Sequence, residues 1–152
     1  MKTCIVFLLF LDVSFFAAAQ EPSHEYDSTL ARQLGADEYG MKSYVLVILK
    51  TGHADIQDKA LRDSLFLGHF ANMRRLAEQK KLVVSGPLAA NERDYRGIFI
   101  FDVGTTEEAV QLLKGDPTVA AGIFDTELYP WYGSAALPVY LETARKISKR
   151  NP

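Results

Sequence analysis

Cysteine is nearly absent from this sequence. The chain of 152 residues contains a single one, Cys4, close to its N-terminus. Disulfides, thiol nucleophiles and thiolate metal ligands all need cysteine, so a mature chain that has lost Cys4 can use none of them. An excess of positive charge is absent as well, because 17 basic residues face 19 acidic ones. We therefore expect no nucleic acid and no anionic membrane as partner.

Several chemical motifs are also missing. The sequence has no glycine-rich phosphate loop, no nucleophile elbow and no Ser-His-Asp order, which disfavours nucleotide binding and acyl-transfer hydrolysis. A metal site would need His53, His69 and a carboxylate to converge, and their spacing supports no such site. We therefore expect no metal and no cofactor.

The N-terminus has the composition of a secretory signal peptide. Lys2 is followed by the apolar run 5–11 and then by three alanines that end at Ala19. A membrane span needs roughly 20 apolar residues, and this run, which Asp12 interrupts, is too short. We expect cleavage near Ala19, loss of Cys4 with the signal, and export to the periplasm or the medium, with no membrane segment in the mature chain.

The composition predicts four segments along the chain. Residues 1–19 are the predicted signal peptide, and residues 20–41, which are polar and weakly periodic, form an N-terminal arm or linker. Residues 42–133 hold a single domain, and residues 134–152 form a helical extension.

The hydrophobic periodicity of the domain predicts six elements. An apolar strand at 44–49 precedes an amphipathic helix that includes 65–77, with Asp58 and Asp63 as possible N-caps. Two strands, 82–84 and 97–103, are predicted to pair as a hairpin. They are followed by a second helix, capped by Thr105 or Thr106, and by a strand at 123–132. The order βαββαβ predicts an α+β ferredoxin-like fold, with an antiparallel sheet and two helices on one face.

This fold leaves one sheet face to be covered. The strands at 44–49 and 97–103 are apolar at consecutive positions, although two helices can cover only one face. A homodimer that stacks sheet on sheet is one possible cover. The C-terminal helix is another, because apolar side chains recur there at helical spacing: Leu137, Tyr140, Leu141, Ala144 and Ile147.

His69 is the first candidate for chemistry. It lies within the apolar stripe of the first helix, where a buried imidazole must find a hydrogen-bonding partner. It is either a satisfied core histidine or, with a carboxylate beside it, a proton-transfer residue. Asp116 in the turn Gly115-Asp116-Pro117 is a candidate carboxylate, and its alternative role is to cap a turn or helix.

Four further residues are candidates for ligand binding. Ser85 and Gly86 end a strand, Arg96 precedes Gly97, and Trp131 ends the last strand. Ser85, Arg96 and Trp131 also have structural interpretations. A serine at this position commonly stabilises a turn, an arginine can pair with Asp94, and a tryptophan commonly anchors a core or an interface.

Segments from residue 44 to residue 131 together resemble the YCII-related (YciI-like) family: Gly68-His69-Phe70-Ala71-Asn72-Met73, Val83-Val84-Ser85-Gly86-Pro87, Tyr95-Arg96-Gly97, Asp116-Pro117 and Tyr129-Pro130-Trp131. The resemblance implies a ferredoxin-like fold of the dimeric α/β-barrel type. It also implies an active-site histidine and aspartate, which map onto His69 and Asp116.

Two functions remain open at this point. The first is a small-molecule enzyme of the isomerase or lyase type, in which His69 moves a proton and Asp116 orients it without a cofactor. The second is a non-catalytic, ligand-binding or accessory homodimer of the cell envelope, in which the same pair is a structural hydrogen bond. A paired, partly exposed His69 in an open cleft favours the first function, and a filled core around it favours the second.

Overall fold

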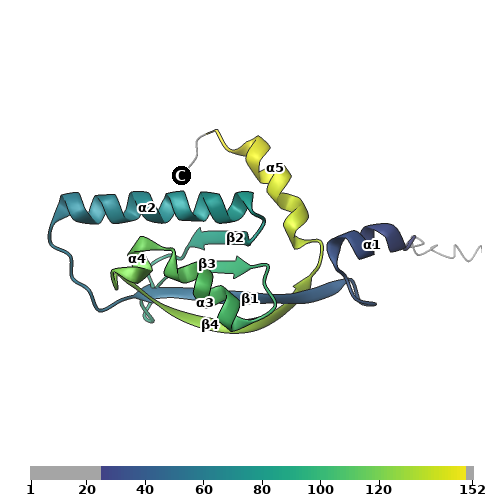
Figure 1. Cartoon of the computed structure of the whole chain (residues 1–152), viewed down its shortest axis with the longest axis horizontal. Helices are drawn as coiled ribbons and strands as arrows, with labels where there is room; N and C mark the ends of the chain where they lie inside the picture. Colours follow the sequence, from purple (N-terminus) through teal and green to yellow (C-terminus); the bar gives the residue numbers. More distant parts are fainter. Residues whose placement is uncertain (1–24, 150–152) are drawn as a thin grey trace, which may run out of the picture.

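The computed structural model describes residues 25–149. The predicted signal peptide, 1–19, lies outside this range. A short helix, α1 (Ser28–Leu34), stands in the predicted arm, and Figure 1 shows it at one end of the molecule, beyond the sheet. Within residues 25–149, none of the helices is both long and apolar enough to cross a membrane.

Four antiparallel strands form one sheet, with the order β2-β3-β1-β4. They are β1 (Met41–Thr51), β2 (Leu82–Pro87), β3 (Tyr95–Phe101) and β4 (Phe124–Ser134). With α2 between β1 and β2, and α3 between β3 and β4, this is the ferredoxin-like α+β fold, and the predicted fold class is confirmed (Figure 1).

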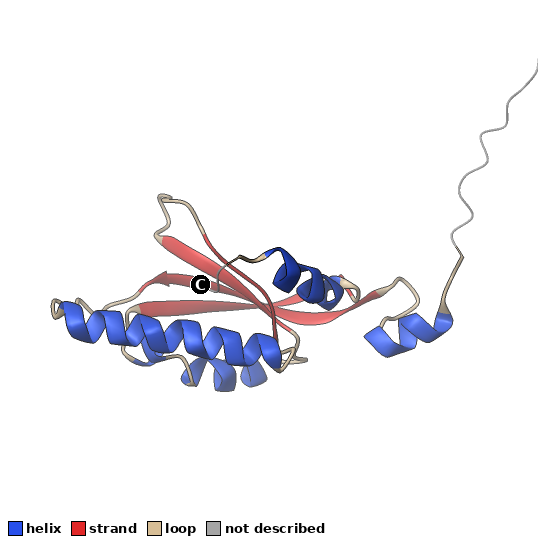
Figure 2. Ribbon diagram, turned by 90° about the horizontal axis from the view of Figure 1, so that it is seen from above, coloured by secondary structure: helices blue, strands red, loops and turns tan. Residues whose placement is uncertain are grey.

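The helices begin where side chains cap them. Asp58 accepts hydrogen bonds from the first turn of α2 (Lys59–Glu78), and Thr105 caps α3 (Thr106–Lys114), as the sequence indicated. A four-residue helix, α4 (Pro117–Ala120), was not anticipated, and Asp116 caps it. Figure 2 shows the long helix α2 and the shorter helices behind it on the same side of the sheet.

The core lies between this helical layer and the sheet. Val45, Val47 and Leu49 of β1 point into it and are at most 3% exposed. They pack with Phe99 and Phe101 of β3 and with side chains of α2 and α3. Full burial of one such side chain stabilises the fold by about 1.5–3 kcal/mol, so this layer holds the helices on the sheet.

The opposite sheet face is less covered. Its residues on the two central strands, Leu46, Ile48, Ile98 and Ile100, are only half-buried. The C-terminal segment, η1 (Leu137–Val139) and α5 (Tyr140–Ile147), lies beside strand β2 at the sheet edge, where the Tyr140 hydroxyl donates to the Val83 carbonyl at 2.6 Å (Figure 1). α5 therefore protects the sheet edge and leaves this face open.

Strand β2 is longer than predicted. The segment Ser85-Gly86-Pro87 reads as a turn in the sequence, but it continues the ladder with β3, where Ser85 lies opposite Phe99 and Pro87 opposite Gly97. Pro87 is tolerated because β2 is an edge strand, which needs no amide on its outer side. The reversal lies farther on, in residues 88–94.

Candidate functional site

His69 and Asp116 lie in direct contact beneath the sheet. The Nδ1 atom of His69, on α2, is 2.7 Å from Oδ2 of Asp116, at the start of α4. His69 is 6% exposed and Asp116 is fully buried. The two residues are separated by 47 positions in the sequence, so the contact depends on how α2 and α4 pack.

Gly68 allows that packing. A Cβ atom at Gly68 would lie 2.7 Å from Cγ of Pro117, which is closer than real side chains approach. The absence of a side chain therefore lets α4 approach α2 directly beside His69. Pro117 is well suited to the first position of α4, because its ring fixes φ and its missing N–H has no partner there in any helix.

Thr118 is the third member of the site. Its backbone N–H and its hydroxyl both donate to Oδ1 of Asp116, at 3.0 and 2.7 Å. The same hydroxyl oxygen is 3.2 Å from Nδ1 of His69. Because the hydroxyl proton is directed at Asp116, the oxygen accepts from His69, and Nδ1–H has two acceptors, Asp116 and Thr118.

This network determines which ring nitrogen is available. With its proton on Nδ1, a neutral His69 carries its lone pair on Nε2. Among residues 25–149, Nε2 has no hydrogen-bonding partner, and no side-chain nitrogen or oxygen in that range is both fully buried and unpartnered. Nε2 is therefore accessible from the cavity beside it and can accept a proton from a bound molecule.

Asp116 is held as a carboxylate. Burial alone raises its pKa, but hydrogen bonds from His69 and Thr118 and the nearby imidazole outweigh burial and lower the pKa below its ordinary value. An ionised Asp116 keeps the proton of His69 on Nδ1 and stabilises the imidazolium that forms when Nε2 is protonated.

A cavity of about 230 Å³ opens at His69 between α2 and the sheet. Its walls are mainly apolar, and the His69 ring is stacked on that of Phe99, with centroids 6.0 Å apart. The lining side chains that surround the imidazole are Phe66, Phe70, Met73, Phe99 and Phe124. Such a cavity suits a flat, largely apolar ligand, since aromatic rings pack against one another edge to face or offset.

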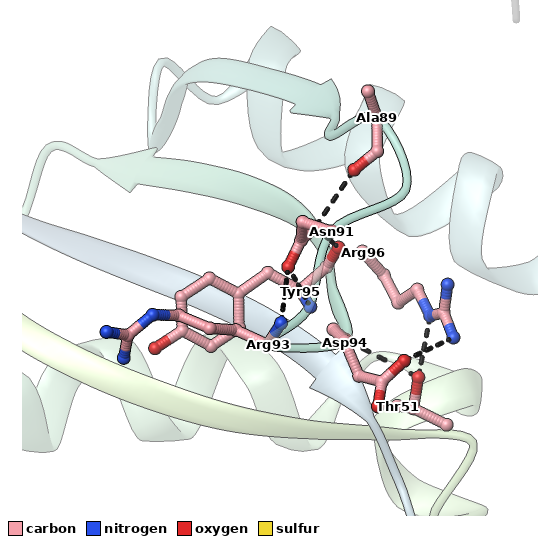
Figure 3. A network of polar contacts seen from close by, with 7 residues as sticks. All are labelled: Thr51, Ala89, Asn91, Arg93, Asp94, Tyr95 and Arg96. Atoms are coloured by element: carbon pink, nitrogen blue, oxygen red, sulfur yellow. Dashed lines mark hydrogen bonds and ion pairs between the residues drawn. The ribbon is translucent and has the colours of Figure 1, made fainter.

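Arg96 lies at the rim of this cavity, as does Gly86. The guanidinium group donates through Nε to the Thr51 hydroxyl at 2.6 Å and through Nη2 to Asp94 at 3.2 Å (Figure 3). Its side chain is 44% exposed. Two anchors on the protein hold it in one orientation, which makes it a positioned cation at the entrance.

The loop before Arg96 is held by one asparagine (Figure 3). The Asn91 side chain accepts from the backbone N–H groups of Arg93 and Tyr95, and it donates to the carbonyls of Ala89 and Tyr95. Asp94 has a positive φ of 55°, which aspartate tolerates better than most residues. The turn is therefore well defined, and Arg96 begins from a fixed backbone.

Two of the predicted ligand residues lie elsewhere. Ser85 lines a neighbouring hollow instead of the His69 cavity. Trp131 lines neither cavity: it lies opposite Tyr44 in the sheet, with ring centroids 5.6 Å apart. Side chains alternate along a strand, and the adjacent pair Val45 and Pro130 has the core-facing register, so Trp131 belongs to the other face.

Thr118 and the aromatic side chains around His69 were not predicted from the sequence. A signal for Thr118 was present, because Asp116 followed by Pro117 is a typical helix start, and a side chain two positions after the cap lies within reach of it. No comparable signal existed for Phe99 and Phe124, which approach His69 from strands far away in the sequence.

The topology and this site define a ferredoxin-like domain with a buried His-Asp pair at an apolar cavity. The model of the YCII-related domain matches residues 44–132, which is more than half of the chain. The protein therefore belongs to the YCII-related domain family, as the sequence resemblance indicated. The match includes His69 and Asp116 and ends before η1 and α5.

The solved structures that are similar to this chain include one enzyme. It is the 5-chloro-2-hydroxyhydroquinone dehydrochlorinase from Burkholderia phenoliruptrix AC1100, in complex with 2,5-dihydroxybenzoquinone. The two chains are 21% identical with a TM-score of 0.41, and the similarity covers 57% of this chain and 92% of the other. Comparison with curated proteins gives no match.

Proposed function

We propose that this protein is a small-molecule enzyme of the isomerase or lyase type, in which His69 is the general base. The observation that carries the proposal is the orientation of the imidazole: Asp116 and Thr118 hold Nδ1–H, and Nε2 is directed to an apolar cavity. A base must lie within reach of the proton that it removes, and His69 lines the cavity that would hold the ligand.

The proposed reaction moves one proton. Nε2 of His69 accepts it from a C–H or O–H group of the substrate, and the carboxylate of Asp116 stabilises the imidazolium. In an isomerase, the imidazolium returns the proton to another atom of the same molecule. In a lyase, the electrons left by the proton form a double bond as a leaving group departs, and the imidazolium returns its proton to that group or to water.

The cavity favours a planar ring as the reacting part of the substrate. A cavity of about 150 Å³ lined by apolar side chains is large enough for benzene, and the cavity at His69 measures about 230 Å³. The difference leaves room for small substituents. Arg96 is paired with Asp94, and its remaining guanidinium N–H groups can donate to an oxygen anion on the ring, such as a phenolate or enolate.

A non-catalytic role is the alternative. Asp116 also caps α4, so the His-Asp contact contributes to the fold whether or not chemistry occurs. In that case the cavity would bind a ligand without changing it.

Deuterium exchange distinguishes these functions before the substrate is known. Cyclic ketones, phenols and cyclic acids are incubated with the protein in D₂O, and loss of C–H signals is followed by NMR. We expect protein-dependent exchange for one class of compound, and we expect His69→Gln and Asp116→Asn to reduce it by about two orders of magnitude or more. His53→Gln is the matched control, because His53 is 81% exposed and contacts another aspartate, Asp125, at 3.6 Å.

Two outcomes would contradict the catalytic role. Exchange that persists in His69→Gln would remove His69 from the mechanism. Compounds that bind at His69 without any exchange would favour the ligand-binding alternative.

We also propose that the protein acts as a homodimer and is exported. The half-buried face around Ile48 and Ile98 supports the first statement, and the composition of residues 1–19 supports the second. For export, intact-mass analysis of protein recovered outside the cytoplasm should give a chain that starts near residue 20, and a chain that retains Met1 would contradict it.

A further inference from the structure

A second hollow lies beside the His69 cavity. It is bounded by the C-terminal half of α2, by β2 and by α5, and its volume is about 440 Å³; we call it the α5 groove. Typical ligand pockets measure about 300–1,000 Å³. The His69 cavity, at about 230 Å³, is smaller than that range, whereas the α5 groove lies within it.

The two hollows are adjacent. Phe70 and Met73 of α2 line both of them. On β2 the consecutive residues Ser85 and Gly86 line one hollow each. The Phe70 ring is 5.4 Å from the ring of His69 and is 37% exposed, so it forms a thin wall between them. A substituent on a ring bound at His69 would therefore reach the groove by extending past Phe70.

The groove combines an apolar floor with a net positive charge. Leu82, Val83 and Leu141 contribute apolar surface. Arg74 and Arg145 also line it, and neither forms an ion pair within the part of the chain that the structure describes. Glu78 is the single carboxylate among the lining side chains, so the groove carries one excess positive charge.

The α5 wall is an addition to the family domain. The YCII-related match ends at residue 132, whereas α5 spans Tyr140–Ile147. The hydrogen bond from Tyr140 to the carbonyl of Val83, at 2.6 Å, fixes α5 against the β2 edge and brings Arg145 to the groove. Any ligand contact made by Arg145 therefore belongs to this chain's own extension.

We propose that the α5 groove is the second half of the substrate site and binds an apolar substituent that ends in a carboxylate. This inference rests on the proposed function, because it assumes that the reacting ring lies at His69. The apolar floor accommodates an alkyl chain, and the terminal carboxylate pairs with Arg74 and Arg145, since guanidinium groups bind carboxylates through two parallel hydrogen bonds.

The test uses phenol and phenols that carry a para-alkyl chain of increasing length. Each chain ends either in a carboxylate or in an alcohol, and binding to the purified protein is measured by calorimetry and by NMR of the His69 ring. We expect the carboxylates to bind about tenfold more tightly than the matching alcohols once the chain reaches the groove. We expect this preference to be lost in Arg74→Gln and in Arg145→Gln.

Two controls remove the same charge outside the groove. The control variants are Arg62→Gln and Lys146→Gln. Arg62 lies on α2 and Lys146 lies on α5, and neither residue lines the groove. Both variants should keep the carboxylate preference. Loss of the preference in these controls would indicate long-range charge instead of a site, and would overturn the proposal.

The outcomes separate this proposal from the proposed function. If phenol shifts the His69 signals but carboxylates bind no better than alcohols, the groove proposal is wrong and the catalytic role of His69 stands. If carboxylates bind through Arg145 without shifting His69, the groove is not part of the same site. If phenol fails to shift His69 in every variant, the failure lies with the proposed ring site at His69.

Discussion

Asp116 serves two structures with its two oxygens. Oδ1 accepts from the N–H and the hydroxyl of Thr118 and so begins α4, while Oδ2 accepts from His69. A single buried carboxylate thereby connects the start of a helix to the orientation of an imidazole on another element. Its replacement should affect both the stability of the fold and the state of His69.

The lowered pKa of Asp116 leads to a prediction on acid stability. A carboxyl group with a depressed pKa in the fold stabilises the protein above its unfolded pKa, and this contribution is lost as the pH falls through the folded value. The ordinary value is 3.8, so we expect the free energy of unfolding to decrease as the pH falls below 3.8. In Asp116→Asn the free energy of unfolding should depend less on pH in the acid range. At neutral pH it should be lower than in wild type by about 1–3 kcal/mol.

Denaturant titrations across the acid range measure this effect. Asp125→Asn is the matched control, because Asp125 lies 3.6 Å from His53 in an exposed pair and is itself 58% exposed. It should change stability little. If the free energy of unfolding had the same pH dependence in wild type and in Asp116→Asn, the assignment of Asp116 as a buried carboxylate would be contradicted.

At the scale of elements, the approach of α2 to α4 creates the site. The close contact between Gly68 and Pro117 brings His69 to Asp116, and neither helix places the two side chains together by itself. Alanine normally stabilises a helix interior relative to glycine by about 1 kcal/mol. At position 68 the close contact with Pro117 should make alanine less stable than glycine.

We therefore predict that Gly68→Ala destabilises the protein by about 1–3 kcal/mol, as overpacked positions do. It should also weaken the His69–Asp116 contact, which the NMR signals of the His69 ring report. The double variant Gly68→Ala with Pro117→Ala relieves the clash, so its cost should be smaller than the sum of the two single costs. If the costs of the two single substitutions simply added, Gly68 and Pro117 would not limit how closely α2 and α4 pack.

The sequence predicted the regular elements well because their signals are local. The caps at Asp58 and Thr105 and the continuous apolar run of β1 are visible within a few residues. The added length of β1 and β4 was missed, because Met41 pairs with Ser134 through sheet register and not through local composition. α4 was missed because four residues are too few for a periodic pattern.

The site was predictable to a smaller extent. Helical spacing singled out His69, and the family resemblance supplied Asp116 as its partner. The cavity required tertiary structure, since its walls come from α2 and from strands on both sides of β1. The same reason applies to Trp131: its position near the end of β4 is visible in the sequence, but the sheet face that it occupies is not.

In the fold as a whole, one face of the sheet is apolar and is not covered by the helices. Leu46, Ile48, Ile98 and Ile100 form an apolar patch on the side opposite the helices, and α5 does not cover it. Charged side chains beside this patch are paired, because Glu127 accepts from Lys50 and Asp102 accepts from Lys42, each at 2.7 Å. Such a face can be buried against a second copy without leaving an unpaired charge.

We predict that the purified protein is a dimer in light scattering and that Ile48→Glu converts it to a monomer. A carboxylate at the centre of an apolar interface would be desolvated without a partner. Leu61→Glu is the control, since Leu61 lies on α2 and is 50% exposed; it should remain dimeric. A monomeric wild type would contradict the sheet-face interface.

The most direct test concerns the proton on His69. Long-range ¹⁵N–¹H NMR of ring-labelled histidine identifies the protonated nitrogen of the neutral imidazole, and the spectrum is recorded with and without phenol. The hydrogen bonds from Nδ1 to Asp116 and Thr118 predict a proton on Nδ1 and an unprotonated Nε2 whose signal shifts when phenol binds. A proton on Nε2, or an Nε2 signal that no ligand moves, would contradict the role of His69 as the base of this site.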